Sequence, residues 1–434
     1  MSCFFHLKTL ISLSEEWEEP SELFNIFSFI GIVMDPTKLN DQKLQEFLHR
    51  WPELSLATGQ DNDEILSLTR EVSMESGANK ICFDDAPNFL TYPMSIGSDC
   101  LYFLWRNPSH DDKKGEVVGT ATIIFKDKIF DGAKKRVAYL SGLRFSTRMS
   151  RKLRARWRGV YRDILKLLLG RGSCYSVDYA YTSVLDENNR AKNSFLKSRY
   201  FKYIPKEKYR SINTAAFMPW GLFGISFLKG TKLFGHDYDV EKLSANLDEE
   251  YTDFLNRQLT ENMVMPSSTY KSEKPNLFAV SKAGKIVCSF KIDHKDSRKY
   301  FLKAISLKIM ALNIFLRILK RPVVKREESL RILNINFFII DRELPLKHKI
   351  LCVMLVLAQI YKNEKFRNFH IVNFIPPCGM DRIEIDKLSF WLKMFGVVFH
   401  SEHGTLYEVQ PEGMTEDKKN RLCKAPMFLE VGYL

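Results

Sequence analysis

The clearest pattern of apolar and polar positions lies in the first half of the chain, where it predicts a strand, a helix and a second strand. Residues 137–145 (VAYLSGLRF) and 176–182 (SVDYAYT) are runs of strand length, rich in aromatic and β-branched side chains. Residues 156–169 between them are expected to form a helix, and a second, short helix should end near Tyr200. A strand, a basic turn and a helix in this order present a helix N-terminus, which can bind an anion.

The residues before this unit predict a helix and an antiparallel hairpin. Residues 61–64 (DNDE) can cap a helix that continues through Val72. Residues 100–105 and 117–125 are strand-like runs, and the hydrophilic turn 111–116 separates them. The chain therefore enters the first strand of the unit from an antiparallel pair.

The second half of the chain repeats this plan. A helix and a hairpin precede a strongly apolar strand, a buried helix, another strand, another helix and a closing hairpin. These elements are expected at residues 248–259, 277–280 with 286–292, 330–340, 350–361, 369–375, 386–395, and 397–400 with 405–409. The repeat, at a spacing of roughly 190 residues, indicates internal duplication.

Residues 300–321 interrupt the second half with an amphipathic pattern. One helical face gathers apolar side chains, namely Phe301, Leu302, Ile305, Ile309, Leu312, Leu316 and Leu319. Basic side chains lie elsewhere, namely Lys303, Lys308, Arg317, Lys320 and Arg321. Such a helix either packs against its own domain or lies on an anionic membrane, so peripheral membrane contact is one partner that the sequence predicts.

The order of these elements resembles the general N-acetyltransferase (GNAT) superfamily. Three motifs carry the resemblance: the strand beginning Val117–Ala121, the run Tyr139–Phe145 with the basic loop after it, and Asn188-x-x-Ala191 at the start of the short helix. The closing run Phe201–Thr214 is similar to that of large uncharacterised bacterial proteins with two tandem GNAT-like domains.

This resemblance, which covers about residues 55–220, implies an α+β fold of two tandem GNAT-like domains, each a mixed, mostly antiparallel sheet flanked by helices. A candidate acyl-CoA-binding domain is expected at residues 35–220, and a degenerate second domain at residues 221–434. We expect residues 1–34 to be a poorly defined N-terminal extension. Their apolar run is too short to span a bilayer, and the acidic residues before it do not fit a signal peptide.

Composition narrows the class of partner. Lysine and arginine exceed aspartate and glutamate by 13, which favours a phosphate-bearing partner. The eight cysteines show no CxxC spacing and the nine histidines no cluster, so we expect no metal and a reducing, cytoplasmic setting. Residues 197–203 mix basic and aromatic side chains that could stack on RNA, but such a mixture more often reflects ordinary packing, and we expect no nucleic-acid partner. The oligomeric state is not predicted.

The resemblance implies that acetyl-CoA or another acyl-CoA binds where two parallel strands part, with its pyrophosphate at the start of the next helix. From Ser146 to Arg162, seven of seventeen residues are basic and none is acidic. The residues expected at this site are Leu143, Phe145, Arg148, Arg151, Arg154, Gly159 and Asn188. The two closely spaced glycines of the family's Arg/Gln-x-x-Gly-x-Gly/Ala motif are missing. The site therefore binds through side chains, binds weakly, or has lost its cofactor.

Candidate catalytic groups follow the second strand of the unit. Asp186 and Glu187 are carboxylates near the expected gap, and Tyr181 lies on the strand itself, so each could act as the general base for an amine. The two carboxylates equally fit the N-cap of the following helix. The position at which the family has a proton-donating tyrosine is occupied by Phe195, which cannot donate.

The second domain has no glycine in the equivalent loop and places Asp341 and Glu343 where phosphates would lie. We expect it to close one side of a substrate groove. The sequence as a whole predicts an acyl-CoA-dependent N-acyltransferase, in the first instance an acetyltransferase, acting on an unknown amine. The alternative is a non-catalytic GNAT-like protein that binds an anionic ligand, a partner or a membrane surface. The missing glycines and Phe195 favour this alternative, whereas the arginine-dense loop favours the enzyme.

Overall fold

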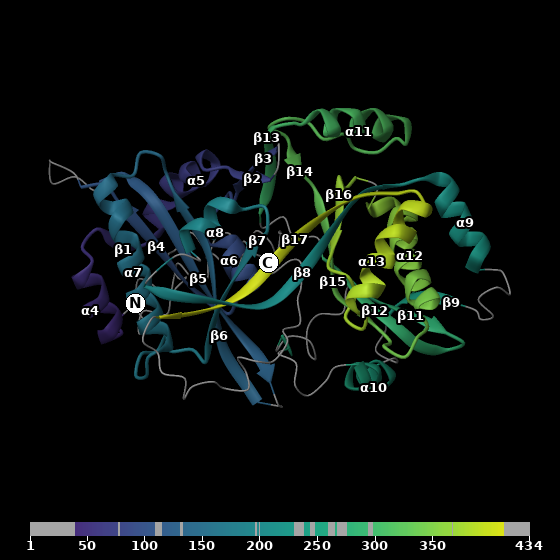
Figure 1. The fold of residues 1–434 in the computed structure, drawn as a ribbon, viewed down its shortest axis with the longest axis horizontal. Helices are drawn as coiled ribbons and strands as arrows, with labels where there is room; N and C mark the ends of the chain where they lie inside the picture. The colour runs from purple at the N-terminus through teal and green to yellow at the C-terminus, as the bar shows by residue number, and fades with distance from the viewer. Residues whose placement is uncertain are drawn as a thin grey trace, which may run out of the picture.

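The computed structural model contains one large sheet, one small sheet and the helices that cover them (Figure 1). It describes residues 40–76, 79–108, 115–130, 133–195, 198, 200–229, 238–243, 248–258, 265–266, 276–293, 298–366 and 368–411. The expected extension at residues 1–34 lies outside the described residues. Within the described ranges, no helix combines the length and the apolar composition needed to cross a membrane.

The first half has the predicted order of elements. Strands β4 (Asp99–Arg106), β5 (Val117–Phe130) and β6 (Ala133–Phe145) are antiparallel neighbours. Helix α7 (Arg151–Leu169) follows, and strand β7 (Tyr179–Leu185) pairs in parallel with β6. The other elements of this half are α4 (Gln42–Arg50), β1 (Leu54–Leu56), α5 (Asn62–Glu71), β2 (Met74–Ser76), β3 (Asn79–Asp84), α6 (Thr91–Ile96), α8 (Asn189–Phe195) and β8 (Phe201–Phe217), with a 3-10 turn at Gly59–Asp61.

The second half repeats this order. Strands β11 (Leu277–Lys282) and β12 (Lys285–Asp293) form the expected hairpin. Strand β15 (Ile332–Ile340) leads into α12 (Leu346–Lys362), and β16 (Ile371–Phe374) pairs in parallel with β15. The other elements are α9 (Pro219–Lys229), β9 (Tyr238–Lys242), α10 (Asp248–Gln258), β10 (Met265–Pro266), β13 (Lys299–Ala304), α11 (Leu307–Ile318), β14 (Ser329–Leu330), α13 (Arg382–Met394) and β17 (Val397–Pro411), with a 3-10 turn at Glu364–Phe366. The predicted α+β class is confirmed, and the division into domains near residue 220 stays a prediction.

The two halves share the large sheet by exchanging their longest strands. The strand order is β1-β4-β5-β6-β7-β17-β8-β16-β15-β12-β11-β9, with β10 on β5. Strand β17, which comes from the end of the second half, therefore lies between β7 and β8 of the first half (Figure 1). Strand β8 in turn lies between β17 and β16. The antiparallel β17–β8 pair runs along the whole of both strands and joins the two halves.

One expectation about β17 is wrong. The sequence predicts a hairpin at residues 397–400 and 405–409, because the residues between them are polar and include Gly404. The structure has one continuous strand, and Gly404 lies opposite Tyr209 of β8. A Cβ atom at Gly404 would lie 2.3 Å from the Tyr209 ring. The glycine therefore makes room for an aromatic side chain on the neighbouring strand, and no turn forms there.

The expectation of one helix over residues 300–321 is also wrong in its first part. Strand β13 pairs with β3 of the first half and with β14, and with β2 these strands form the small sheet. Helix α11 starts only after Ser306, whose hydroxyl accepts a hydrogen bond from the N–H group of Ile309 at 3.4 Å. Leu302 is buried at the small sheet, so the first apolar positions of the pattern belong to a strand. Helix α11 lies outside the body of the protein (Figure 1).

Candidate functional site

Two parallel strands at the centre of the first half separate after a short paired region. Strands β6 and β7 pair over Val137–Tyr139 and Tyr179–Tyr181, and no backbone pairing joins them further on, although both strands are described along their whole length. Beside this opening β6 carries a bulge, where Gly142 has a φ of 64°. A Cβ atom on Gly142 would lie 2.7 Å from Oγ1 of Thr122. Both the backbone conformation and the available space therefore require glycine at the bulge.

Helix α7 presents a basic face to the opening. Arg151, Arg154 and Arg158 are spaced by three and four residues, so they share one side of the helix, and all three line the cavity described below. Nη2 of Arg154 donates to the carbonyl oxygen of Ser146 at 3.1 Å, which holds this guanidinium near the helix N-terminus. The first turn contains no acidic residue. The helix dipole and the three guanidinium groups therefore act together on an anion.

The backbone at the start of α7 also offers donors. Ser150 is the N-cap, and its hydroxyl accepts from the N–H group of Leu153 at 3.3 Å. The N–H groups of Arg151 and Lys152 have no hydrogen-bond partner in the described part of the chain. Leu153 lies where the family has glycines, but its side chain is buried in the core and does not block the approach of a phosphate. These residues fit a pyrophosphate held by arginine side chains and two N–H groups.

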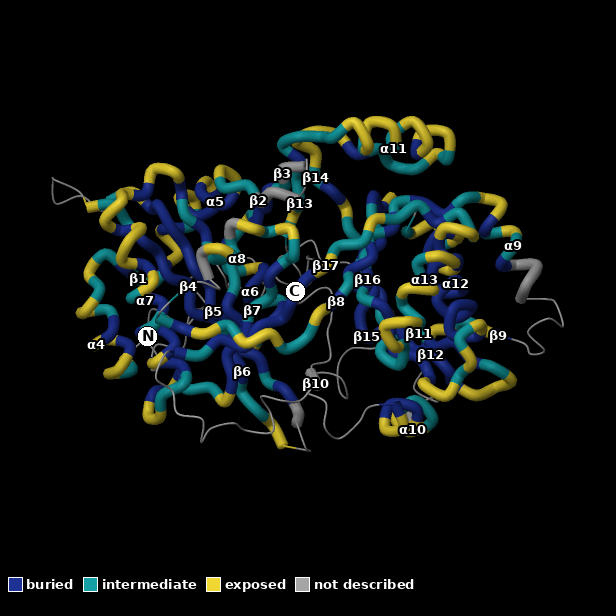
Figure 2. The backbone as a smooth tube through the Cα atoms, in the orientation of Figure 1, coloured by how far each residue is buried: buried dark blue, intermediate teal, exposed yellow. Residues whose placement is uncertain are grey.

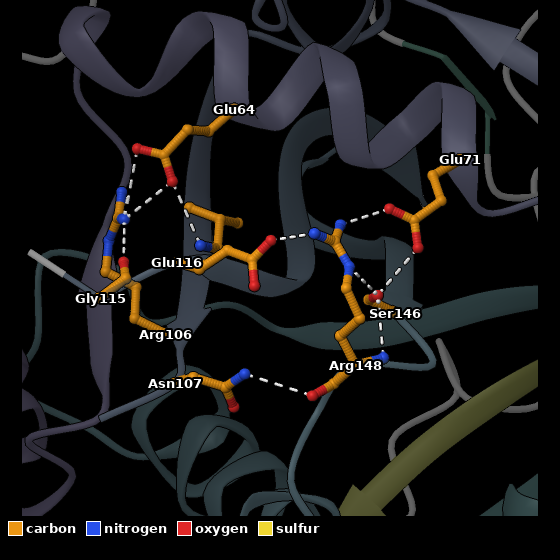
Figure 3. A network of polar contacts seen from close by, with 9 residues as sticks. Glu64, Glu71, Arg106, Asn107, Gly115, Glu116, Ser146 and Arg148 are labelled. Carbon is orange, nitrogen blue, oxygen red and sulfur yellow. Dashed lines mark hydrogen bonds and ion pairs between the residues drawn. The ribbon is translucent and has the colours of Figure 1, made fainter. Parts of the chain in front are cut away.

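Two residues expected at this site lie elsewhere. Arg148 belongs to a polar network in which its guanidinium pairs with the carboxylates of Glu71 and Glu116 (Figure 3). These carboxylates neutralise Arg148, which does not line the cavity. Gly159 faces away from the opening, since a Cβ atom there would lie 3.1 Å from the ring of Trp51. Neither residue is positioned to contact a ligand in the opening.

The opening continues into a groove of about 1810 Å³ that crosses the sheet between the two halves. The first half contributes several of the predicted residues to its lining, namely Leu143, Phe145, Arg151, Arg154, Glu187 and Asn188. The second half contributes side chains of α11, β16 and β17, among them Leu312, Asn373, His400 and Glu402. Sites for one small molecule usually have volumes of about 300–1,000 Å³, so this groove has room for two substrates.

The three predicted catalytic residues have different surroundings. Tyr181 is buried and stacks on Tyr139, with ring centroids 5.2 Å apart, and it does not line the groove. Asp186 is engaged in an ion pair, with Oδ1 3.4 Å from Nζ of Lys192. Glu187 is exposed and lines the groove. Of the three, only Glu187 can meet a substrate there directly.

The start of α8 has a different cap from the one that the sequence suggested. Oδ1 of Asn188 accepts a hydrogen bond from the N–H group of Ala191 at 3.0 Å. Asn188 is therefore the capping residue, and neither Asp186 nor Glu187 fills this role. Phe195 occupies the position at which the family has a proton-donating tyrosine. Its side chain lies outside the described part of the structure.

Glu402 on β17 is a carboxylate that the sequence analysis missed. It lines the groove together with His400, which lies two residues earlier on the same face of the strand. Burial raises the pKa of the Glu402 carboxyl, and Glu187 acts in the same direction, while His400 and a hydrogen bond with Asn213 act in the opposite direction. A half-buried carboxyl with a raised pKa in a groove of this kind is typical of a general base. Residues 400–403 (HSEH) are all polar, so no local alternation in the sequence marked Glu402 as a groove residue.

Tyr209 on β8 brings a hydroxyl group to the same region. Its ring packs against Gly404, and its hydroxyl is hydrogen-bonded to the hydroxyl of Ser183 on β7. Burial raises the pKa of Tyr209 to about 12, so the hydroxyl keeps its proton at neutral pH. Tyr209 and Ser183 both line the groove. In the described residues, no group of three or more histidine, cysteine, aspartate or glutamate side chains could hold a metal ion.

The corresponding opening in the second half is closed by the chain itself. Strands β15 and β16 pair in parallel over Ile332–Ile335 and Ile371–Phe374. Just beyond β16, the N–H group of Cys378 donates to the carbonyl oxygen of Phe338 at 2.9 Å. The carbonyl oxygen of Cys378 accepts from the N–H group of Ile340, also at 2.9 Å. The segment after β16 therefore occupies the place at which the first half has its opening.

Comparison with solved structures identifies the architecture. No protein-family model matches the chain, and no curated protein sequence matches it. A glucosamine N-acetyltransferase region of a fungal multi-domain β-N-acetylglucosaminidase matches 82% of the chain with a TM-score of 0.50 and 9% identity, and the match spans 38% of that protein's length. Saccharomyces cerevisiae N-myristoyltransferase with bound myristoyl-CoA matches over 86% of the chain and 84% of its own, with a TM-score of 0.44 and 12% identity. The strand order, the bulge and the first of these likenesses together show that this chain has the GNAT fold.

Proposed function

We propose that this protein is an acyl-CoA-dependent N-acyltransferase whose first half binds the acyl-CoA and whose shared groove binds an amine acceptor. The observation that carries the proposal is the opening between β6 and β7, with the Gly142 bulge on one edge and the arginine face of α7 beside it. The same groove contains the carboxyl of Glu402, whose pKa is raised. An anion site, a parted strand edge and a candidate base thus share one cavity.

Acyl-CoA binding follows from the charges around the opening. Arg151, Arg154 and Arg158 would form charge-assisted hydrogen bonds with the phosphates of CoA, and the open N–H groups at the start of α7 would add two more. Leu143 and Phe145 offer apolar surface to the rest of the molecule. The edge of β6 that β7 leaves unpaired offers backbone groups to the amide bonds of the pantetheine arm.

The proposed reaction forms a C–N bond and breaks a C–S bond. Glu402 takes a proton from the amine, directly or through water, and the nitrogen lone pair attacks the thioester carbonyl carbon. The C–S bond then breaks, and its electron pair remains on sulfur. Tyr209, whose pKa of about 12 exceeds that of a thiol, keeps its proton and donates a hydrogen bond to the departing thiolate. The proton held by Glu402 passes to the thiolate, which leaves an amide and free CoA.

A thermal-shift titration of the full chain with CoA, acetyl-CoA and a long-chain acyl-CoA tests this function. A ligand at about 100 times its dissociation constant stabilises the native state by about 2.7 kcal/mol. We expect at least one acyl-CoA to raise the melting temperature, and the acyl length with the largest shift identifies the donor. If none of the three stabilises the protein, the proposal is wrong.

A second function, binding to an anionic membrane, is favoured by α11. Within this helix only Leu316 is buried. Five of its large apolar side chains are exposed, namely Leu307, Met310, Ile314, Phe315 and Ile318. Figure 2 shows much of the helix in the colour of exposed residues. Residues 298–326 around the helix contain nine basic residues and no acidic residue. We propose that the apolar side chains enter the lipid while the lysines and arginines contact anionic headgroups, because this charge pattern complements such a surface.

Vesicle co-sedimentation tests the membrane proposal. We expect the protein to sediment with vesicles that contain phosphatidylserine and not with vesicles of phosphatidylcholine alone. The double variant Ile314→Ser, Ile318→Ser should lose this binding, whereas Phe390→Ser, Met394→Ser on α13, which also removes exposed apolar side chains, should retain it. Equal sedimentation with both vesicles would overturn the role of anionic headgroups, and self-association that the α11 variant abolishes would indicate a second copy of the chain as the partner of this helix.

A further inference from the structure

Two arginines that line the groove, the buried Arg144 and the half-buried Arg298, lie near the carboxylate of Asp85. Arg298 forms a bidentate pair with Asp85, with Nε to Oδ1 at 2.6 Å and Nη2 to Oδ2 at 3.0 Å. Arg144 is 8% exposed and makes one hydrogen bond to a described protein group, from Nη1 to the carbonyl oxygen of Thr69 at 3.2 Å. Both guanidinium groups lie over the ring of Phe83, at 5.1 Å for Arg298 and 4.7 Å for Arg144.

This cluster has an excess of positive charge. Burial, and then the charge of Arg298, lower the pKa of Arg144 to about 10, so Arg144 is still a cation at pH 7. Among the described residues, Asp85 supplies the carboxylate that acts on both guanidinium groups. Two positive charges and one negative charge leave one positive charge without a counterion. Most N–H donors of Arg144 also lack a protein acceptor, and Arg144 lines the groove, so these donors are available to a ligand there.

The cluster can be reached from the groove. Arg144 and Arg298 line the groove and also a small polar cavity beneath it of about 10 Å³, which is close to the space that one water molecule needs. Tyr92, Tyr102 and Thr122 line the same small cavity. An anionic oxygen entering from the groove would therefore meet guanidinium and hydroxyl donors together.

The cluster lies on the opposite face of the sheet from the arginines of α7. Leu140 of β6 packs in the core beneath α7, whereas Tyr139 packs on the other face, with α6. Arg144 is on the latter side, since it bonds to Thr69 of α5. It is also only two residues from the bulge at Gly142. A CoA phosphate at α7 and an anion at Arg144 would thus approach the opening from different faces.

We propose that Arg144 and Arg298 recognise a carboxylate on the acyl acceptor, so that the acceptor is a primary amine with a carboxylate near its amino group. This inference rests on the proposed transferase function. The planar carboxylate matches the fork of N–H donors on a guanidinium, and it supplies the missing counterion. With its carboxylate bound to these arginines, the acceptor can place its amino group at the bulge. An amine without the carboxylate would bring no counterion for Arg144, which disfavours its binding relative to the carboxylate.

The experiment measures acyl transfer to matched amines by the full-length protein, using the acyl-CoA that gives the largest thermal shift. Each pair contains a carboxylate and its amide: glycine with glycinamide, L-lysine with L-lysinamide, and a dipeptide with its amide. We expect the carboxylate to have a kcat/KM about 10- to 100-fold higher than its amide in at least one pair. The Arg144→Gln variant should reduce this ratio to near one, and Arg144→Lys should restore part of it.

The outcomes separate this inference from the function on which it rests. Thermal stabilisation by acyl-CoA, together with transfer to amides as fast as to carboxylates, would overturn the carboxylate site and leave the transferase standing. A preference for aminomethylphosphonate over glycine would overturn the choice of carboxylate. An absence of any stabilisation by acyl-CoA would overturn both. The wild-type ratio decides the question even if the Arg144→Gln variant does not fold.

Discussion

The two halves of this protein build the same arrangement of parallel strands and a bulge, yet only one of them leaves it open. In the first half the bulge is formed by Gly142, and the opening beside it leads to the arginine face of α7. In the second half the bulge on β15 is formed by Phe337, at a φ of 49°, and Cys378 fills the opening. Such a backbone conformation costs a bulky residue about 1–3 kcal/mol, which the burial of the Phe337 side chain offsets.

The helix that follows the bulge shows the same contrast. At the start of α7 the arginines face the groove. At the start of α12 the buried Lys349 is already neutralised, since its Nζ lies 3.0 Å from the carboxylate of Glu384 and donates to the carbonyl oxygen of Gly379 at 2.8 Å. In this protein an opening that could hold a ligand therefore remains only where no other part of the chain occupies the strand edge and the helix N-terminus.

The largest effect is expected from Glu402→Gln in the open half, which should lower kcat by about 100- to 10,000-fold because the general base is lost. The raised pKa keeps the wild-type carboxyl protonated, and inactive as a base, to a higher pH than in an ordinary glutamate. The wild-type rate should therefore rise with pH through that raised pKa, and the variant should lack this rise. Steady-state pH profiles measure both effects.

The matched control for this variant lies in the second half. Glu343→Gln changes an exposed glutamate in the loop after β15 and should leave the rate and its pH profile unchanged. A Glu402→Gln variant with the wild-type pH profile would show that another group accepts the proton, and Glu187 would be the next residue to change.

A smaller effect is expected from the triple variant Arg151→Ala, Arg154→Ala, Arg158→Ala, which removes the basic face of α7. Each charge-assisted hydrogen bond contributes about 1.5–3 kcal/mol, so the affinity for CoA should fall by at least about 100-fold. Isothermal titration measures it. Arg156→Ala on the same helix is the control, because Arg156 pairs with Glu53 instead. Equal losses in the two proteins would contradict a phosphate site on this face.

Lys349→Met in the closed half is expected to leave ligand binding unchanged. This change leaves Glu384 without its buried partner and should lower the free energy of unfolding by about 3 kcal/mol. Urea denaturation measures the loss, and Lys347→Met, at an exposed lysine of the same helix, should cost far less. A decrease in CoA affinity without loss of stability would mean that the second half also binds the cofactor.

The fold was predictable from the sequence to the extent that it depends on local pattern. The runs at residues 137–145 and 330–340 have strand composition wherever they pack, and the α7 sequence is amphipathic along its length, so the order of the elements is correct. The basic loop likewise predicted Arg151 and Arg154, which line the groove, because charge density is visible in the sequence. Local pattern could not reveal that Arg148 meets Glu71, which is 77 positions away in the chain.

The strand exchange explains what the sequence analysis missed at the site. Residues 400–404 are polar and contain a glycine, which locally favours a turn. They form a strand because β8 pairs with all of them and β7 pairs with the strand from Gly404 onward, and this information lies about 200 positions earlier in the chain. The position of Glu402 in the groove, the packing of Tyr209 on Gly404 and the closure by Cys378 are all long-range pairings of this kind.

The position of β17 also means that β7 is synthesised long before the strand that pairs with it. Leu185 ends β7 and Val397 begins β17, so the ribosome adds 397 − 185 = 212 residues after Leu185 to reach Val397. At a synthesis rate of about 5–20 residues per second, on the order of ten to forty seconds pass before β17 is available to pair with β7. During that time the nascent first half has an unpaired strand edge, which is the kind of surface that chaperones protect from aggregation. A chain that stops early carries the arginine face but lacks Glu402, so an unfinished polypeptide could hold a cofactor without using it.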